Sequence, residues 1–148
     1  MVAVIQRVSS ASVEIENQLH TSIGEGLLVL VGVKKGDTED NARQLAKKTA
    51  DLRIFQDNED KMNLSIKDIK GELLIISQFT LCTDNDKSGN RPSFTFAEEP
   101  EKANHLYEKF IDDLKLYYDK DKILSGKFAA RMKINLINEG PVTIILEK

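Results

Sequence analysis

The sequence predicts an α+β fold in which mainly antiparallel strands form a barrel or sandwich and two helices pack against it. About eight short apolar or alternating stretches are separated by polar turns, which is typical of strands joined as hairpins. Only two stretches carry apolar residues at helical spacing, too few for repeated strand–helix–strand units. The 148 residues contain neither a repeat nor a linker, so residues 1–148 are expected to form one domain.

Four strands are expected in the N-terminal part of the chain: residues 1–8, 12–16, 19–23 and 27–33. The last of these is a continuous apolar run between glycines, which indicates a central strand buried on both faces. Asp37 or Thr38 can cap the first helix, in which alanine and leucine recur at helical spacing as far as Leu52.

The C-terminal part is expected to supply the remaining extended segments: residues 53–55, 62–64, 72–81, 128–137 and 142–146. Pro100 suits the first turn of the second helix, whose apolar stripe continues to Leu114. Residues 66–71 and 117–126 are interpreted as connections, and Asn138 to Pro141 as a turn.

The composition is that of an ordinary soluble globular protein. Hydrophobic residues make up 41% and charged residues 30%, and no apolar run approaches the roughly 20 residues that span a membrane. The first residues show no signal peptide, and the single cysteine, Cys82, fits a reducing cytoplasm. A net charge of −3 argues against broad binding of nucleic acid, although local cations such as Lys87 and Arg91 would suffice to contact one end.

Several kinds of catalytic centre are not indicated. The two histidines, His20 and His105, have no metal-ligand spacing, and there is neither a nucleophile elbow nor a phosphate-binding loop. The acidic turn at residues 57–60 lacks the ligand pattern of a calcium loop. Cys82 is expected to be a buried thiol rather than a nucleophile.

The segment from Glu72 to Leu81 is an unusual strand because it ends in polar residues. Residues two apart in a strand share a face, so Gln78 and Thr80 are expected to project together, opposite Ser77 and Phe79. Beyond the sheet ladder, free backbone N–H groups near Phe79 and Thr80 could hold the oxyanion of an acyl-transfer step. The alternative is a polar strand end satisfied by its neighbours.

A second polar segment lies near the C-terminus, at Asn138 to Thr143. A turn at Gly140-Pro141 leaves carbonyls without donors, and such carbonyls could accept hydrogen bonds from a substrate ammonium group. Thr143 shares a face with Pro141 if the last strand begins there. Arg7, on the face of Ile5, either reaches solvent or fixes a backbone carbonyl near a site.

These two segments match motifs of a known family. The sequence resembles the D-aminoacyl-tRNA deacylases, also called D-tyrosyl-tRNA(Tyr) deacylases, in SQFTL at residues 77–81 and NEGPVT at residues 138–143. The resemblance extends over nearly the whole chain. It includes QRVSSASV at 6–13, GLLVLVGV at 26–33, RIFQDNEDKMNLS at 53–65, RPSF at 91–94 and GKFAARM at 126–132.

The resemblance implies a cytoplasmic homodimer with its site at the subunit interface. It implies hydrolysis of the ester that joins a D-amino acid to the 3′-terminal adenosine of tRNA, and also of glycine mischarged on tRNA(Ala). Neither a metal nor an organic cofactor is implied.

The resemblance also implies roles for particular residues. A Gly-cisPro element would enter the partner's pocket, hold the substrate ammonium group by its carbonyls and exclude an L side chain, which gives selectivity by repulsion. Arg7 would orient these carbonyls, and Ala103 would keep space beside the pocket. The implied catalytic residues are Ser77, Gln78, Phe79 and Thr80, and the implied substrate-binding residues are Arg7, Ala103, Gly140, Pro141 and Thr143.

Thr80 leaves two mechanisms open. As a nucleophile it would need a base, and the sequence offers no obvious one. Otherwise, N–H groups near Phe79 and Thr80 stabilise the oxyanion while the ribose 2′-hydroxyl helps to activate water. Two other classes also remain open, namely a non-catalytic module that binds RNA ends and a general esterase without chiral preference.

Overall fold

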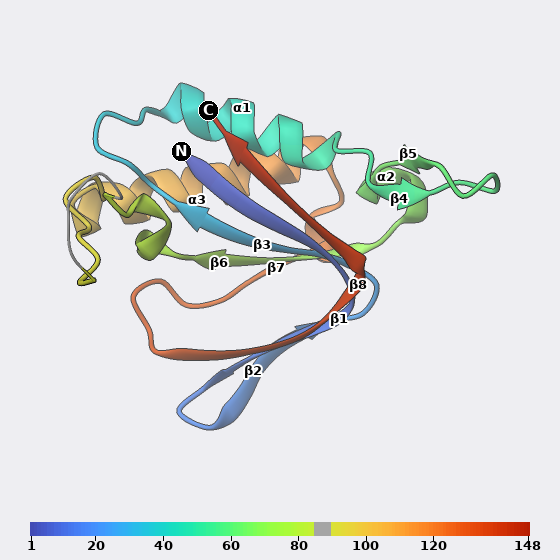
Figure 1. Cartoon of the computed structure of the whole chain (residues 1–148), viewed down its shortest axis with the longest axis horizontal. Coiled ribbons are helices and arrows are strands. Elements are labelled where there is room, and N and C mark those ends of the chain that lie inside the picture. The colour runs from blue at the N-terminus through green and yellow to red at the C-terminus, as the bar shows by residue number, and fades with distance from the viewer. Residues whose placement is uncertain (85–89) are drawn as a thin grey trace.

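The computed structural model of the chain describes residues 1–84 and 90–148. Its main element is a six-stranded sheet of order β2-β1-β3-β6-β7, with β8 paired to the other side of β1 (Figure 1). The strands are β1 (Val2–Ile15), β2 (Gln18–Ile23), β3 (Gly26–Gly32), β6 (Glu72–Ser77), β7 (Ile123–Ser125) and β8 (Met132–Glu147). A two-stranded ribbon of β4 (Phe55–Gln56) and β5 (Met62–Leu64) extends from one end of the molecule.

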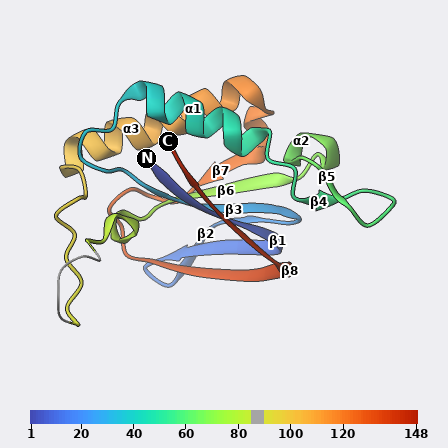
Figure 2. The same cartoon turned by 45° about the horizontal axis from the view of Figure 1, so that its top comes forward.

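The first strand, β1, belongs to both halves of a strongly bent sheet. Residues 2–8 pair with β3 and residues 11–15 pair with β2, both antiparallel. On its other side β1 pairs with β8 along most of its length. Because β3–β6 and β6–β7 are parallel pairs, the sheet is mixed, and its bend almost closes it into a barrel (Figures 1 and 2).

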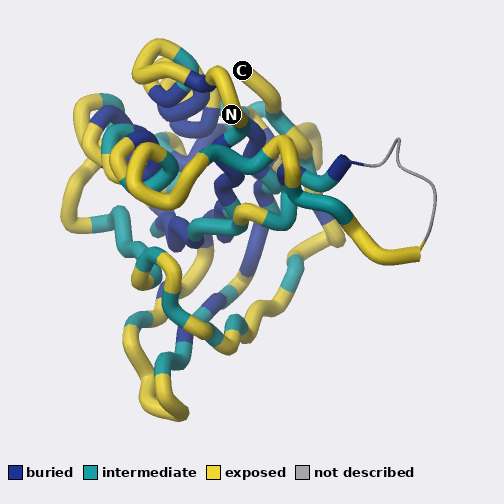
Figure 3. The backbone as a smooth tube through the Cα atoms, turned by 90° about the vertical axis from the view of Figure 1, so that its left-hand side faces the viewer, coloured by how far each residue is buried: buried dark blue, intermediate teal, exposed yellow. Residues whose placement is uncertain are grey.

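The central strands bury both of their faces, as the apolar run in β3 predicted. Leu27 and Val29 belong to the larger core, which lies between the sheet and the helices. Leu28 belongs to a second core inside the bend, with Val13 and Ile23. Burial of each such side chain contributes about 1.5–3 kcal/mol. Figure 3 shows the buried backbone running through the middle of the molecule.

Helices α1 (Glu39–Ala50) and α3 (Pro100–Tyr117) lie side by side over one face of the sheet (Figures 1 and 2). Thr38 is the N-cap of α1 and forms a capping box with Asn41, while the Asp37 carboxylate accepts a hydrogen bond from the Lys34 N–H at 2.6 Å. Pro100 begins α3 as expected, because the first turn of a helix does not need its N–H.

Three local expectations were wrong. Residues 66–71 contain a one-turn helix, α2 (Ile66–Ile69), capped by Ser65, so the described residues have three α-helices rather than two. Residues 117–126 contain a 3-10 turn, η2 (Lys120–Lys122), and strand β7, whose pairing with β6 is non-local. The expected strands at residues 1–8 and 12–16 are a single strand, β1.

The α+β class is confirmed, and the two ends of the chain lie together, with the Lys148 N–H donating to the Met1 carbonyl at 2.9 Å. Across residues 1–84 and 90–148, no helix has the length and apolar character that crossing a membrane would require.

Candidate active site

The segment after β6 forms a tight turn instead of a longer strand. The sheet ladder ends where the Gln78 N–H donates to the Val31 carbonyl at 2.7 Å, and a 3-10 helix, η1 (Phe79–Cys82), follows. The expectation that the strand continues to Leu81 was therefore wrong. Leu81 closes the turn by donating from its N–H to the Gln78 carbonyl at 3.3 Å.

The turn exposes two backbone donors. The first N–H groups of a helical turn have no partner within it. Within residues 1–84 and 90–148, the N–H groups of Phe79 and Thr80 make no hydrogen bond. Two adjacent donors of this kind are the groups that stabilise an oxyanion.

Gln78 and Thr80 do come together, but through the turn rather than through strand alternation. The Gln78 side-chain amide donates to the Thr80 hydroxyl oxygen at 2.5 Å. An amide N–H cannot take a proton, so this contact orients the hydroxyl without activating it as a nucleophile. Phe79 is 60% exposed and meets the Phe94 ring edge to face, with 5.2 Å between ring centroids.

A cavity of about 520 Å³ opens beside this turn. Ser77, Gln78 and Phe79 contribute to its lining, and so does Ala103 on α3. The remaining lining residues are mostly apolar: Val31, Val33, Ile76, Ala97, Glu98, Pro100, Tyr107, Phe128, Ala129, Ala130, Met132 and Ile134.

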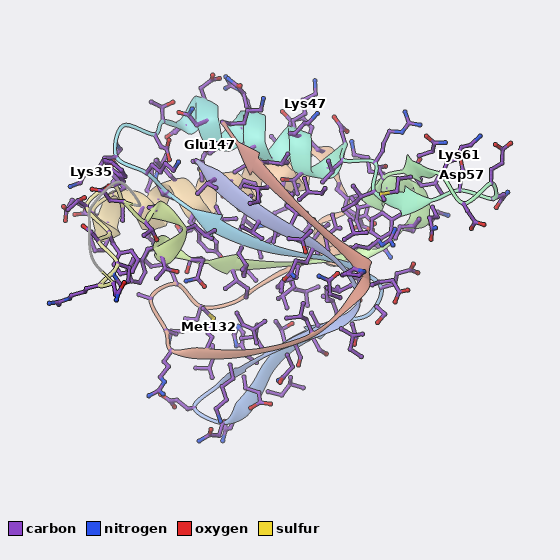
Figure 4. The ribbon with its side chains drawn as sticks, in the orientation of Figure 1. Lys35, Lys47, Asp57, Lys61, Met132 and Glu147 are labelled. Atoms are coloured by element: carbon purple, nitrogen blue, oxygen red, sulfur yellow. The ribbon has the colours of Figure 1, made fainter. Side chains whose placement is uncertain are left out.

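Tyr107 and Phe128 form part of the pocket wall that the sequence did not reveal. The Tyr107 hydroxyl donates to the Ile75 carbonyl at 2.9 Å, and its ring is 5.9 Å from that of Phe128. Burial raises the pKa of the Tyr107 hydroxyl, which keeps it protonated and unsuited as a general base. Tyr107 lies in the apolar stripe expected for the second helix and Phe128 at the start of an expected strand, so neither was singled out as a site residue. Met132 also lines the pocket. It is labelled in Figure 4, where its side chain points inward from β8.

Gly140 and Pro141 lie in a bulge of β8 rather than in a turn between two strands. The β1–β8 ladder pairs Val8 with Asn138 and Gln6 with Thr143, so residues 139–142 have no ladder partner. The expected turn at Asn138 to Pro141 was therefore wrong, because β8 continues on both sides of it. The Gly140–Pro141 peptide bond is cis, and both residues are exposed.

Two polar side chains hold this bulge. Arg7, only 7% exposed, donates from Nε to the Glu139 carbonyl at 3.1 Å and from Nη1 to the Ile54 carbonyl at 2.8 Å. Asn138 accepts from the Val142 N–H at 3.0 Å and donates to the Thr143 hydroxyl at 3.1 Å. Arg7 thus fixes backbone carbonyls, which was the second of its two interpretations.

One chain does not bring the two segments together. Gly140, Pro141, Arg7 and Thr143 are absent from the pocket lining. In Figures 1 and 2, β6 leads into η1 at one end of the sheet, whereas the bend of β8 lies at the other end. A single site built from both segments requires a second copy of the chain.

Other chemically suggestive residues lie away from the pocket. His105 pairs with Glu39 at 2.8 Å on the helix surface, and His20 is exposed on β2. Cys82 is buried with its thiol 3.3 Å from the Val33 carbonyl, and burial raises the pKa of that thiol. Neither histidine nor the cysteine lines the pocket.

No group of metal-binding side chains occurs among the described residues. In the acidic turn, the Asp57 carboxylate accepts hydrogen bonds from the N–H groups of Glu59 and Lys61 and from the Asn63 amide. Figure 4 places Asp57 and Lys61 at the far end of the molecule from Met132. Lys87, a candidate cation, lies outside the described residues, and Arg91 is exposed.

Comparison with known proteins places this chain and its fold in a defined class. Residues 4–147 match the family described as D-Tyr-tRNA(Tyr) deacylase. A protein of Geotalea daltonii named D-aminoacyl-tRNA deacylase is 54% identical over 147 residues, which cover 99% of this chain and 96% of the relative. Another of that name from Thermosipho melanesiensis is 50% identical, covering 99% of this chain and 97% of the relative.

Two solved structures share the fold. One, named c-Myc DNA Unwinding Element Binding Protein, has a TM-score of 0.94 and 38% identity, and covers 100% of this chain and 99% of that one. The other, described as a probable eukaryotic D-amino acid tRNA deacylase, has a TM-score of 0.83 and 16% identity. The match covers 99% of this chain and 98% of that one. The fold expected from the resemblance is therefore confirmed.

The fold and the family match define an enzyme of the aminoacyl-tRNA deacylase class, which confirms the expectation of an ester hydrolase. The chain belongs to the D-Tyr-tRNA(Tyr) deacylase family.

Proposed function

We propose that this protein hydrolyses the ester bond of D-aminoacyl-tRNA and releases the free D-amino acid and tRNA. The observation that carries the proposal is the pair of N–H groups of Phe79 and Thr80, without partners in the described residues. Phe79 lines the apolar pocket, and Thr80 follows it in the same turn just outside the lining. Donors fixed before the reaction stabilise developing charge without reorganisation, and each is worth roughly 3–4 kcal/mol in comparable sites.

In this mechanism, water attacks the ester carbonyl and the resulting oxyanion accepts hydrogen bonds from Phe79 and Thr80. The ribose 2′-hydroxyl of the substrate helps to activate the water. The Thr80 hydroxyl remains an orienting group, because its hydrogen-bond partner in the described residues is the Gln78 amide, which is a donor. The substrate therefore supplies the activating group that Gln78 cannot.

Chiral selection is assigned to the Gly140–Pro141 bulge of a second copy in a homodimer. Its carbonyls, outside the sheet ladder, would hold the substrate ammonium group, and its backbone would collide with an L side chain. Arg7 supports the wall through the Glu139 carbonyl, and Thr143 lies beside it through Asn138. A rigid wall rejects one hand without recognising any particular D side chain.

The same wall extends the substrate range to glycine. Glycine has no side chain to collide, so glycine mischarged on tRNA(Ala) is also a proposed substrate. Ala103, which lines the pocket, keeps space for the substrate. We further propose that the tRNA is bound through its 3′ end. The proposed reaction needs no added cofactor, and the proposed location of the protein is the cytoplasm.

The deciding experiment compares D-tyrosyl-tRNA and L-tyrosyl-tRNA as substrates of the purified protein. We expect rapid release of tyrosine from the D ester alone. Cleavage of both esters and of small esters without chiral preference would instead identify a general esterase.

A second candidate function is a non-catalytic module that binds nucleic acid. It is favoured by the 38% identical structure, whose name is that of a DNA element binding protein. The net charge of −3 opposes extensive contact with phosphates. Equal, slow loss of both tyrosyl esters would support this candidate over the deacylase.

A further inference from the structure

Two segments of opposite charge contribute to the pocket lining. One segment, here called the basic rim, is residues 126–131, the turn between β7 and β8. The other, here called the acidic rim, is residues 98–102, at the start of α3. Both rims contribute residues to the pocket lining, Phe128 to Ala130 from the first and Glu98 and Pro100 from the second.

The basic rim presents cations that no described residue neutralises. Lys127 and Arg131 are exposed, and neither side chain makes an ion pair or hydrogen bond within residues 1–84 and 90–148. The sequence contains no Asp or Glu between residues 126 and 138. Two cations therefore stand at this rim with no carboxylate from their own segment to screen them.

The backbone of the basic rim is fixed, so these cations have a defined place relative to the pocket. The Ala130 N–H donates to the Lys127 carbonyl at 3.2 Å, and Ala129 has a positive φ of 58°, which closes a tight turn. The Gly126 N–H donates to the Ile75 carbonyl at 2.9 Å, which ties the turn to β6.

The acidic rim has the opposite character. Glu98 is held by Lys102 at 2.6 Å, and this contact lowers the pKa of its carboxyl. Glu99 and Glu101 are exposed and have no cation partner in the described part of the chain. A polyanion approaching the pocket is repelled on this side and attracted on the other.

We infer that the RNA strand leaves the pocket across the basic rim, with Lys127 and Arg131 contacting backbone phosphates close to the terminal nucleotide. This inference rests on the proposed function for the identity of the RNA. It gives the bound strand a direction, away from α3. It also accounts for RNA binding by an acidic protein, because only two local cations are needed.

The test is binding of a fluorescent RNA hairpin with a single-stranded 3′ end, measured by anisotropy across a salt series. Two phosphate contacts on a single strand predict a slope of log Kd on log salt of about 1.4, since each contact contributes about 0.7. The double variant Lys127→Gln/Arg131→Gln should weaken binding roughly two- to fivefold per charge and bring the slope near zero.

The matched control is Lys47→Gln/Lys48→Gln, which removes the same two charges from α1. Both lysines are exposed, and Figure 4 shows Lys47 on the side of the molecule opposite Met132. The control should bind RNA like the original chain, and Glu99→Gln/Glu101→Gln should bind equally well or better. Equal losses in the two variants that remove cations would indicate a general charge effect and overturn the inference.

Hydrolysis separates this inference from the proposed function. With the D-tyrosyl ester of adenosine, which carries no phosphate chain, the Lys127/Arg131 double variant should keep the original rate. An unchanged RNA affinity and salt slope in that variant would refute the basic rim even if D-specific hydrolysis is observed. Absence of D-specific hydrolysis would refute the deacylase proposal. The binding experiment would still show whether Lys127 and Arg131 contact RNA phosphates.

Discussion

In the proposed mechanism, Phe79 and Thr80 act through their backbone N–H groups as much as through their side chains. Gln78 leaves the sheet with φ −143° and ψ 83°, and the next two N–H groups then begin a 3-10 turn with no acceptor of their own in the described chain. A side-chain substitution leaves these donors in place. Their contribution can therefore be measured only by removing an N–H.

Phe79→Pro removes that donor without breaking a hydrogen bond in the described structure, because Phe79 is the first residue of the turn. We expect the single-turnover rate on D-tyrosyl-tRNA to fall about 100- to 1,000-fold relative to Phe79→Ala. Phe79→Ala is the matched control, since it loses the same ring contact with Phe94 but keeps the N–H. Equal rates in the two variants would exclude an oxyanion role for this group.

Thr80→Ala separates the two roles considered for the hydroxyl. We expect the rate to fall by no more than about tenfold, because the variant loses an orienting hydrogen bond and not a nucleophile. Rapid acid quench with substrate labelled in the amino acid should show no label on the protein. A folded Thr80→Ala variant that binds substrate yet has no turnover, or a trapped acyl-enzyme, would contradict this mechanism.

At the scale of elements, the position of η1 depends on its close approach to β3. A Cβ atom on Gly32 would lie 3.0 Å from Val2 Cγ1, 3.1 Å from the Cys82 sulfur and 3.1 Å from the Gln78 carbonyl oxygen. Val2 and Cys82 are buried, so little room exists for these neighbours to move. Gly32 therefore sets the distance between the central strand and the turn that carries the donors.

Gly32→Ala should push η1 outward by a few tenths of an ångström and lower the single-turnover rate roughly tenfold, because catalysis is sensitive to sub-ångström placement. Cys82→Ala alone should be nearly neutral for the rate. The double variant should recover part of the loss, since it removes the sulfur from one side of the new methyl group. A fully active Gly32→Ala would show that the turn tolerates displacement.

The bulge in β8 is the other element of the proposed site. Gly140 has φ +115°, and a Cβ there would lie 2.7 Å from the Arg7 guanidinium. Both facts disfavour any larger residue, since side chains rarely adopt this conformation. Arg7 and Gly140 thus form one unit although 133 positions (140 − 7) separate them in sequence.

For the whole molecule, the separation of η1 from the β8 bulge predicts an active site shared between two copies. Phe79→Pro and Gly140→Ala should each be inactive alone, for different reasons. When the two are unfolded and refolded together, half of the dimers contain one chain of each kind, and each of these has one intact site. Activity should therefore return to about a quarter of the original value.

Failure to recover activity, with both variants folded and exchanging subunits, would contradict the shared site. A monomer by sedimentation velocity at micromolar concentration would contradict it as well. Mixing each variant with itself is the control and should restore nothing.

Acid stability also belongs to the whole molecule. The Asn63 amide, followed by backbone N–H groups, lowers the pKa of Asp57 below its ordinary 3.8, and Ser65 lowers that of Asp68. Each group stabilises the fold above its ordinary pKa, and this contribution is lost as the pH falls through the lowered value. The urea midpoint should therefore fall below about pH 4.

Asp57→Asn should show a smaller fall in urea midpoint between pH 6 and pH 3 than the original chain. Glu16→Gln, at an exposed position between β1 and β2, is the control and should show the original fall. If the urea midpoint of Asp57→Asn fell with pH as much as that of the original chain, Asp57 would not contribute to the acid sensitivity of the fold.

The sequence alone determined the fold class, the burial of β3 on both faces and the start of α3 at Pro100, and it singled out the two segments of the proposed site. These features depend on local patterns, such as apolar runs and the fixed backbone geometry of proline. Such patterns can be recognised without knowing the tertiary contacts of the residues. The resemblance also named Ala103, which lines the pocket.

Tertiary structure decided the rest. β7 is recognisable only by its pairing with β6, and Tyr107 and Phe128 became pocket residues only when α3 and the β7–β8 turn were placed beside η1. The 3-10 turn after Ser77 lies against Gly32 through the Gln78 carbonyl, and these two residues are 46 positions (78 − 32) apart in sequence. Long-range contacts of this kind leave no periodic trace in sequence, and so the structure was needed to show that the two segments lie apart in one chain.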